Sequence, residues 1–353
     1  MLVKRTYQIL NKIVCLVCDN PELAQAFHID YQSFEIKKTD PDDCHIHISQ
    51  KGTYLAINNK ELDISGHPRP VHYACQVIVS EIMAQLHDFY LIHAGVVKKE
   101  NILIMLAGPP GIGKSTLTQK LVENGFSFFS DDCAPLHKNS GLIHPFPRSM
   151  WIVGDSEKNI SISVRSKKAI PACQFYSHNI PEKPGMVICL TDKSSKNHII
   201  KLNLSLKNTN NPLLNDLKKI EKIHIHHRHP QYAEYQICYE SSVSTTETIK
   251  QLCAEHKKHL WQIYRINITQ PSFDCQSSIT DISAHQAAAY MIPEMKMFDT
   301  FLSSPKKESA LQSMLTICKH FKESSCFDMT PGTLNSAYHC ILSAFNHFID
   351  GKK

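Results

Sequence analysis

A complete phosphate-binding-loop pattern restricts the folds open to this chain more than any other feature. The pattern G-x-x-x-x-G-K-[ST] is matched by Gly108, Pro109, Pro110, Gly111, Ile112, Gly113, Lys114 and Ser115. The apolar run Asn101 to Ala107 before it predicts a strand buried on both faces. The segment Thr116 to Asn124 after it has helical periodicity, and Gly125 is placed to end that helix. A chance match on a glycine-rich turn is the alternative, but the order of strand, loop and helix favours an α/β core.

The residue types in this loop suit a triphosphate. Glycines allow backbone N–H groups to converge on phosphate oxygens, and a helix starting near Lys114 adds the positive end of its dipole. The Lys114 ammonium can reach the β and γ phosphates, and the Ser115 hydroxyl is a ligand for Mg²⁺. We therefore expect residues 108–116, including Thr116, to bind ATP together with Mg²⁺.

Two adjacent carboxylates, Asp131 and Asp132, follow the next expected strand, Phe126 to Ser130. They would emerge at the carboxyl end of the sheet, at the same edge as the phosphate loop. One carboxylate there can accept a proton from an attacking hydroxyl, and the other can hold the metal directly or through water. A turn or N-cap role is the alternative. Beside a phosphate loop we favour the catalytic role.

His93 ends a short apolar run 15 positions before Gly108. A neighbouring strand could bring it to the same edge, where an imidazole can bind an acidic group or a phosphate. A structural role is the more common one for a single histidine. Spacing alone leaves both open.

These features together resemble a known kinase family. HAG at residues 93–95, GPPGIGKST at 108–116, ENGF at 123–126 and SDD at 130–132 are similar in order and spacing to the kinase domain of HPr kinase/phosphorylase. The run Pro145 to Arg148 (PFPR) resembles more closely the HPr kinase-related proteins found with peptide-maturation genes, including lasso-peptide precursor kinases. The resemblance spans His93 to Met150, about one sixth of the chain.

The resemblance implies a role for each residue of the constellation. Asp131 would be the general base that deprotonates an acceptor serine, with His93 beside the carboxylate pair. Asp132 would support metal or substrate, and Lys114 would stabilise the transferred charge. Arg148 would neutralise charge on the phosphoryl group, with a surface arginine after a proline-rich turn as the alternative.

One part of the family pattern is missing. HPr kinase has a glutamate-bearing segment after its P-loop unit, used for metal binding and for the phosphorylase direction. The nearest acidic residues here, Glu157 and Glu182, stand in no matching context. This departure argues against a reverse reaction and against HPr as the substrate.

Charge and composition exclude some classes of partner. The 38 basic and 33 acidic residues give a net charge of +5, scattered without basic blocks, so nucleic acid is not an expected partner. No apolar run approaches the roughly 20 residues of a membrane span, so no membrane association is expected. Thirteen cysteines without a compact disulfide spacing favour the cytoplasm, with most cysteines as small buried hydrophobes.

Two short motifs have alternative readings as metal or redox sites. His224 and His226 would share one face of a strand, but a solvated basic strand or a phosphate patch near Arg228 is favoured over zinc. Cys15 and Cys18 have the spacing of a redox pair, but their apolar run favours buried structural cysteines.

The expected fold class is α/β, with an HPr-kinase-like P-loop core at residues 89–240, a small N-terminal α+β domain at 1–88 and a helical C-terminal extension at 241–353. Met1 to Cys18 predicts a first strand or helix. Further strands are expected at 44–49, 54–57, 61–64, 186–190 and 199–206. Helices are expected at 70–86, 213–223, 245–263, 282–301, 308–322 and 334–349.

We therefore expect a kinase that transfers the γ-phosphoryl group of ATP to a serine or threonine hydroxyl of a peptide or protein. One alternative is a kinase for a small hydroxyl compound. The other is a nucleotide-dependent switch without a phosphorylated product. The C-terminal stripe of methionines, Met291, Met295, Met297 and Met314, is expected to be core, with a peptide-binding or homo-oligomer interface as the alternative.

Overall fold

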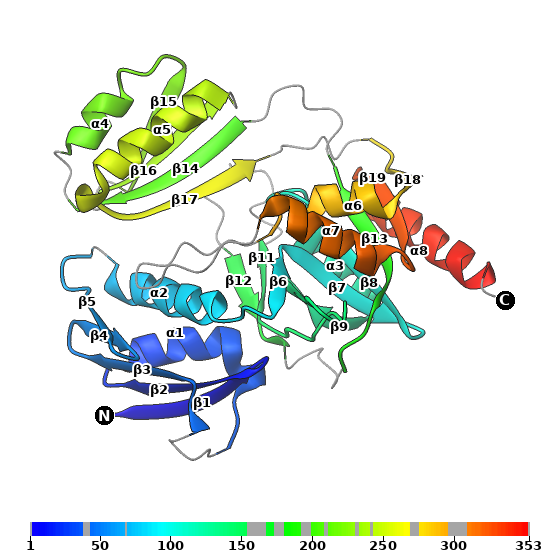
Figure 1. Ribbon diagram of the computed structural model, residues 1–353, viewed down its shortest axis with the longest axis horizontal. Helices are drawn as coiled ribbons and strands as arrows, with labels where there is room; N and C mark the ends of the chain where they lie inside the picture. The colour runs from blue at the N-terminus through cyan, green and yellow to red at the C-terminus, as the bar shows by residue number, and fades with distance from the viewer. Residues whose placement is uncertain are drawn as a thin grey trace.

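The fold is seen in a computed structural model (Figure 1). It describes residues 2–37, 43–67, 69–153, 167–172, 180–191, 199–207, 211–229, 233–240, 243–268, 275–295 and 309–351. Within these residues lie three larger sheets and eight α-helices, which makes a mixed α/β protein as expected. None of the described helices combines the length and the apolar character needed to cross a bilayer.

The N-terminal sheet has the order β1-β2-β3-β4-β5 and carries two helices on one face (Figure 1). Its elements are β1 (Val3–Ile9), β2 (Lys12–Cys18), α1 (Pro21–Tyr31), β3 (Ile46–Lys51), β4 (Tyr54–Ile57), β5 (Lys60–Asp63) and α2 (Pro70–Ala84). In β3, buried and exposed residues alternate, because one face packs on α1 and α2 while the other faces solvent. The same core includes Phe89, Leu91, Cys133 and Phe146, so it continues past residue 88.

The central sheet holds the phosphate loop and has the order β18-β19-β13-β8-β7-β9. Its strands are β7 (Ala94–Lys99), β8 (Ile102–Ala107), β9 (Ser127–Ser130), β13 (Pro184–Leu190), β18 (Ser278–Ile282) and β19 (Ser325–Thr330). Strands β8, β13 and β19 are parallel, whereas β7 runs antiparallel to both β8 and β9. Therefore β8 and β9 end at the same edge of the sheet.

Helices cover both faces of the central sheet (Figure 1). They are α3 (Lys114–Glu123), α6 (Ala284–Met291), α7 (Ala310–Phe321) and α8 (Leu334–Asp350). Met105 of β8 packs in the cluster that contains residues of α6 and α7, and its neighbour Ile104 packs in the cluster of α3 and α8. This alternation explains why β8 is a continuous apolar run. Met291, Met295 and Met314 pack in the first cluster as expected, and Met297 lies outside the described residues.

A separate antiparallel sheet, β15-β16-β14-β17, lies between β13 and β18 in sequence. Its strands are β14 (Ile199–Leu206), β15 (Ile223–His229), β16 (Glu234–Glu240) and β17 (Leu260–Ile268). Two helices, α4 (Pro212–Leu217) and α5 (Val243–Glu255), lie between these strands in the sequence. The helix expected at 245–263 ends at Glu255, and the residues from Leu260 on form β17 because they pair with β14. The boundary expected at residue 240, between the core and a helical extension, therefore falls inside this sheet. The residues after 240 also contribute β18 and β19 to the central sheet, so they do not form a helical extension alone.

Two short strand pairs are the remaining sheets in the described part of the chain. They are β6 (Phe89–Ile92) with β10 (Ala134–His137), and β11 (Met150–Val153) with β12 (Lys167–Ile170). Strand β6 leads directly into β7 through His93, and β10 follows the Asp131-Asp132 pair. The expected catalytic residues His93, Asp131 and Asp132 therefore lie between β6 and β10 in the sequence.

Candidate phosphate-binding and phosphoryl-transfer site

The phosphate loop has the geometry that its sequence predicts. It joins the end of β8 at Ala107 to the start of α3 at Lys114. A Cβ at Gly108 would lie 2.6 Å from the carbonyl oxygen of Leu190, so this position requires glycine. Gly113, with φ of 98°, caps the helix in the left-handed region. The buried Nζ of Lys114 donates hydrogen bonds to the carbonyls of Gly108 at 2.5 Å and Pro109 at 3.0 Å.

Asp131 lies at the carboxyl end of β9, at the edge of the sheet shared with the phosphate loop. Only 3% of the residue is exposed, and its Oδ1 atom has no hydrogen-bond partner among the described residues. Burial raises the pKa of Asp131, and the neighbouring Asp132 charge raises it further. A hydrogen bond from Ser115 and the charges of Lys114 and His93 oppose this rise. The buried carboxylate of Asp131 therefore interacts with the side chains of Ser115 and Lys114.

Asp132 is the exposed member of the pair. Its φ of 65° is left-handed, and half of its side chain is accessible. Oδ1 lies 3.0 Å from Nε2 of His93, and Oδ2 lies 3.9 Å from Nη1 of Arg148. The two carboxylates thus face different partners: Asp131 faces the phosphate loop, and Asp132 faces the histidine and the arginine.

His93 stands beside the end of β8 because the next residue, Ala94, pairs with Ala107. Its Nδ1 atom lies 3.4 Å from Oε2 of Glu294, and its backbone N–H donates to the Glu294 carbonyl at 2.8 Å. Glu294, which follows α6, was not among the residues expected from the sequence, because it lies about 200 positions from His93. No local pattern links the two residues. The pairing of Ile92 with Met295 brings them together.

Gly95, the glycine of the HAG motif, allows α3 to approach β7. A Cβ at this position would overlap the hydroxyl of Thr118 and lie 3.6 Å from Oδ1 of Asp131. Thr118 is fully buried, and its hydroxyl has no hydrogen-bond partner among the described residues. The glycine therefore sets the distance between α3, the helix after the phosphate loop, and β7, the strand that begins directly after His93.

Arg148 connects the site to α1 of the N-terminal sheet. Its Nη2 atom donates to Oδ2 of Asp30, at the end of α1, at 2.9 Å, and its guanidinium lies 5.1 Å from the Tyr31 ring centroid. Trp151 donates to the other oxygen of Asp30 at 2.8 Å. Burial alone would lower the pKa of Arg148, but Tyr31, Asp30 and Asp132 together raise it. Asp30 is a second residue that sequence analysis missed, because the link spans 118 positions.

The other candidates from the sequence lie away from this group or outside the described residues. Glu182 forms an ion pair with Lys98, near the opposite end of β7. Glu157 lies outside the described residues. His224 and His226 are exposed on β15, and no group of potential metal ligands includes them within the described residues. This exposure agrees with the solvated strand expected from the sequence.

The donor atoms at this edge fit a nucleotide with a hard cation. A hydroxyl and two carboxylates, from Ser115, Asp131 and Asp132, are oxygen ligands of the kind that Mg²⁺ prefers. The unpartnered Oδ1 of Asp131 is a buried acceptor available to a proton or a cation. The loop before a ten-residue helix provides N–H groups and a positive helix end for phosphate. The residues present therefore fit ATP and Mg²⁺.

Comparisons with known proteins give partial similarities. The chain matches no protein-family profile. Over 88 residues it is 31% identical to the ATP-dependent kinase YFH7 of Kluyveromyces lactis; the match covers 25% of this chain and 24% of that protein. The chain thus matches about a quarter of the length of this curated relative. The HPr(Ser) kinase/phosphatase structure from Coxiella burnetii is 13% identical, with 48% of this chain and 90% of that chain covered at a TM-score of 0.22.

Proposed function

We propose that this protein is an ATP- and Mg²⁺-dependent kinase that transfers the γ-phosphoryl group to a serine or threonine hydroxyl of a peptide or protein. The observation that carries the proposal is the position of Asp131. Its carboxylate is buried at the edge of the sheet where the phosphate loop lies, accepts a hydrogen bond from Ser115, and has no hydrogen-bond partner for Oδ1 among the described residues. The 88-residue similarity to an ATP-dependent kinase supports the same reaction class.

Positioning and charge stabilisation supply most of the catalysis in phosphoryl transfer, so few groups are needed. Lys114 would exchange its two carbonyl partners for phosphate oxygens, because an ammonium binds an anionic oxygen more strongly than a neutral one. Ser115 and Asp132 would hold Mg²⁺, which screens the phosphate charges when bound. The guanidinium of Arg148 lies beside the carboxylate of Asp132 and would stabilise charge on the transferring phosphoryl group.

Asp131 is proposed as the base that takes the proton of the acceptor hydroxyl. A raised pKa brings a carboxylate closer to the pH at which it must accept a proton, and an unpartnered oxygen can receive it. The hydrogen bond from Ser115 also places Asp131 within reach of a metal held by that hydroxyl. Experiments must therefore separate a base from a metal ligand.

The test is transfer of ³²P from γ-labelled ATP to a pooled library of serine- and threonine-containing peptides, with Mg²⁺. Lys114→Ala is expected to lower transfer by about 10²-fold or more, whereas Lys120→Ala, on the same helix, serves as the matched control. Asp131→Asn is expected to abolish transfer while ATP binding persists. Asp281→Asn, an exposed carboxylate on β18, is the control for loss of a negative charge.

Metal dependence separates the two aspartates. Loss of Asp132 should raise the Mg²⁺ concentration needed for half-maximal rate, with partial recovery at high Mg²⁺ or with Mn²⁺. Loss of Asp131 should not be recovered by metal. If excess metal restores Asp131→Asn and not Asp132→Asn, the two roles are the reverse of those proposed.

Two other functions give different outcomes in the same assay. A small-molecule kinase would label a metabolite extract and no peptide. A nucleotide-dependent switch would bind ATP, label neither, and change its affinity for a partner with the nucleotide. Absence of peptide label together with unchanged ATP hydrolysis in Asp131→Asn would overturn the peptide-kinase proposal.

A further inference from the structure

A cluster of sulfur and imidazole groups lies on the outer face of the N-terminal sheet, away from the phosphate site. In β2, Val14 and Leu16 are buried, so the intervening Cys15 points to the opposite face. In β3, Ile46 and Ile48 are buried and His47 is exposed. Because β2 and β3 are parallel with Cys15 opposite His47, the two side chains share the face that α1 and α2 leave uncovered.

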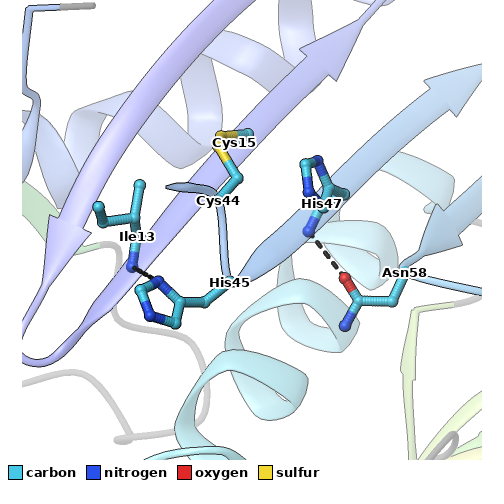
Figure 2. The surroundings of a disulfide bond; sticks show 6 residues. All are labelled: Ile13, Cys15, Cys44, His45, His47 and Asn58. Atoms are coloured by element: carbon cyan, nitrogen blue, oxygen red, sulfur yellow. Dashed lines mark hydrogen bonds between the residues drawn. A yellow bond between two sulfur atoms is a disulfide. The ribbon is translucent and has the colours of Figure 1, made fainter. Parts of the chain in front are cut away.

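Cys44 completes the cluster from the segment just before β3. It forms a disulfide with Cys15, with their Cα atoms 6.1 Å apart (Figure 2). The sequence favoured two buried structural cysteines over a redox pair at Cys15 and Cys18. This is correct for Cys18, which lies on the buried face and donates to Gln50, and wrong for Cys15, whose sulfur is bonded to Cys44. Residues three apart in a strand lie on opposite faces, so the cysteine that reaches Cys15 comes from a distant part of the sequence.

The backbone around the cluster is held in place by hydrogen bonds. The N–H of His45 donates to the Ile13 carbonyl at 2.9 Å, and the Ile13 N–H donates to Nδ1 of His45 at 3.2 Å. On the other side, the N–H of His47 donates to the Asn58 side chain, a bond drawn in Figure 2. Its length is 2.8 Å. These contacts do not depend on the disulfide, so the three side chains would stay close when it opens.

The two sulfurs and an imidazole nitrogen of His47 lie within 4.8 Å of one another. Thiolate and imidazole are the ligands that Zn²⁺ prefers, at about 2.3 and 2.0–2.1 Å, and a tetrahedral site of that size places its ligand atoms less than about 4 Å apart. We propose that Cys15, Cys44 and His47 form a redox-gated zinc site, closed as the disulfide and open to Zn²⁺ as the dithiol. Three protein ligands leave the fourth position to water.

The chemistry of the gate balances with a thiol reductant. Two electrons and two protons from a dithiol such as dithiothreitol break the sulfur–sulfur bond, and the reductant becomes its own disulfide. Zinc then binds the two thiolates as their protons leave to solvent. In the oxidised protein the same sulfur atoms are joined to each other and offer no thiolate, so the site cannot form.

The test uses the full chain, reduced under anaerobic conditions, with Zn²⁺ as the probe and a competing chelator to exclude weak surface binding. Reduced wild type should retain one equivalent of zinc, and the oxidised protein should retain none. Cys15→Ser, Cys44→Ser and His47→Ala should each weaken binding at least tenfold. Cys275→Ser and His87→Ala, both at exposed positions, are the matched controls.

Co²⁺ in place of Zn²⁺ gives a readout on the unmodified protein. Two thiolate ligands should produce a sulfur-to-cobalt charge-transfer band in the near ultraviolet, halved in either cysteine variant. Thermal unfolding of each variant shows whether it is folded. The proposal is overturned if the reduced protein binds no zinc, if the oxidised protein binds it equally, or if all three folded variants bind as wild type does.

Discussion

Nε2 of His93 lies 3.0 Å from Oδ1 of Asp132, while Nδ1 of the same ring lies 3.4 Å from Oε2 of Glu294. The ring is thus oriented by two carboxylates from distant parts of the chain. One of them belongs to the pair that lies beside the phosphate loop.

Glu294 is predicted to position His93 for the reaction. Glu294→Gln keeps the backbone hydrogen bond to His93 and removes the charge, so we expect kcat to fall by about tenfold with the KM for ATP unchanged. In a double-mutant cycle with His93→Gln, the two effects should be non-additive by about 1 kcal/mol or more. Glu255→Gln, exposed on α5, is the control. Additive effects would mean that Glu294 acts independently of His93.

The ion pair of Asp30 with Arg148 is predicted to stabilise the junction between α1 and the site. Both side chains are mostly buried, so Asp30→Asn leaves part of a buried charge without its partner. We expect a loss of about 1–3 kcal/mol in the free energy of unfolding, measured in urea. In the exposed pair of Lys183 and Glu323, Glu323→Gln should cost less than about 1 kcal/mol. Equal losses would contradict the assignment.

The close approach of Gly95 and Thr118 predicts a compensating pair of substitutions. Gly95→Ala should destabilise the fold by about 1–3 kcal/mol, because the new Cβ would overlap the Thr118 hydroxyl. Adding Thr118→Ala removes that hydroxyl and should recover part of the loss. Adding Thr118→Ser keeps an oxygen on Cβ and should recover less. Thermal unfolding of wild type and the three variants measures this, and no difference between the two double variants would refute the steric explanation.

His67 is predicted to make stability fall in mild acid. It stacks on Tyr73, its Nδ1 accepts from the Arg69 N–H at 3.0 Å, and its Nε2 lies 3.3 Å from the Ser205 hydroxyl. Burial lowers the pKa of His67 to about 4 from an ordinary 6.5. Between these values the unfolded chain binds the proton and the folded chain does not, so stability rises with pH.

Acidification from pH 6.5 to 4 should therefore cost up to about 3 kcal/mol through this residue. His67→Gln should show a shallower dependence of the unfolding free energy on pH in that window. His87→Gln, at an exposed position, should follow wild type. An unchanged slope in His67→Gln would assign the acid sensitivity to other groups.

Local patterns in the sequence were sufficient for the elements that carry the phosphate loop. The apolar run before Gly108 predicted β8, and the helical periodicity after Ser115 predicted α3. The carboxylates after the next strand were expected at the same edge, which the shared direction of β8 and β9 confirms. These features follow from nearest-neighbour rules: a buried strand must be apolar on both faces, and a helix must show its 3.6-residue period.

Tertiary structure decided which distant residues complete the site. Glu294 reaches His93 only because the segment after α6 pairs beside β6, and Asp30 reaches Arg148 only because α1 packs there. Residues 260–263, expected to be the end of a helix, belong to a strand because β14 offers them a partner. Cys15 forms a disulfide with Cys44 and not with the nearer Cys18, because Cys18 lies on the opposite face of β2. Periodicity describes neighbours along the chain, whereas strand pairing and helix packing are set by the register between segments far apart in it.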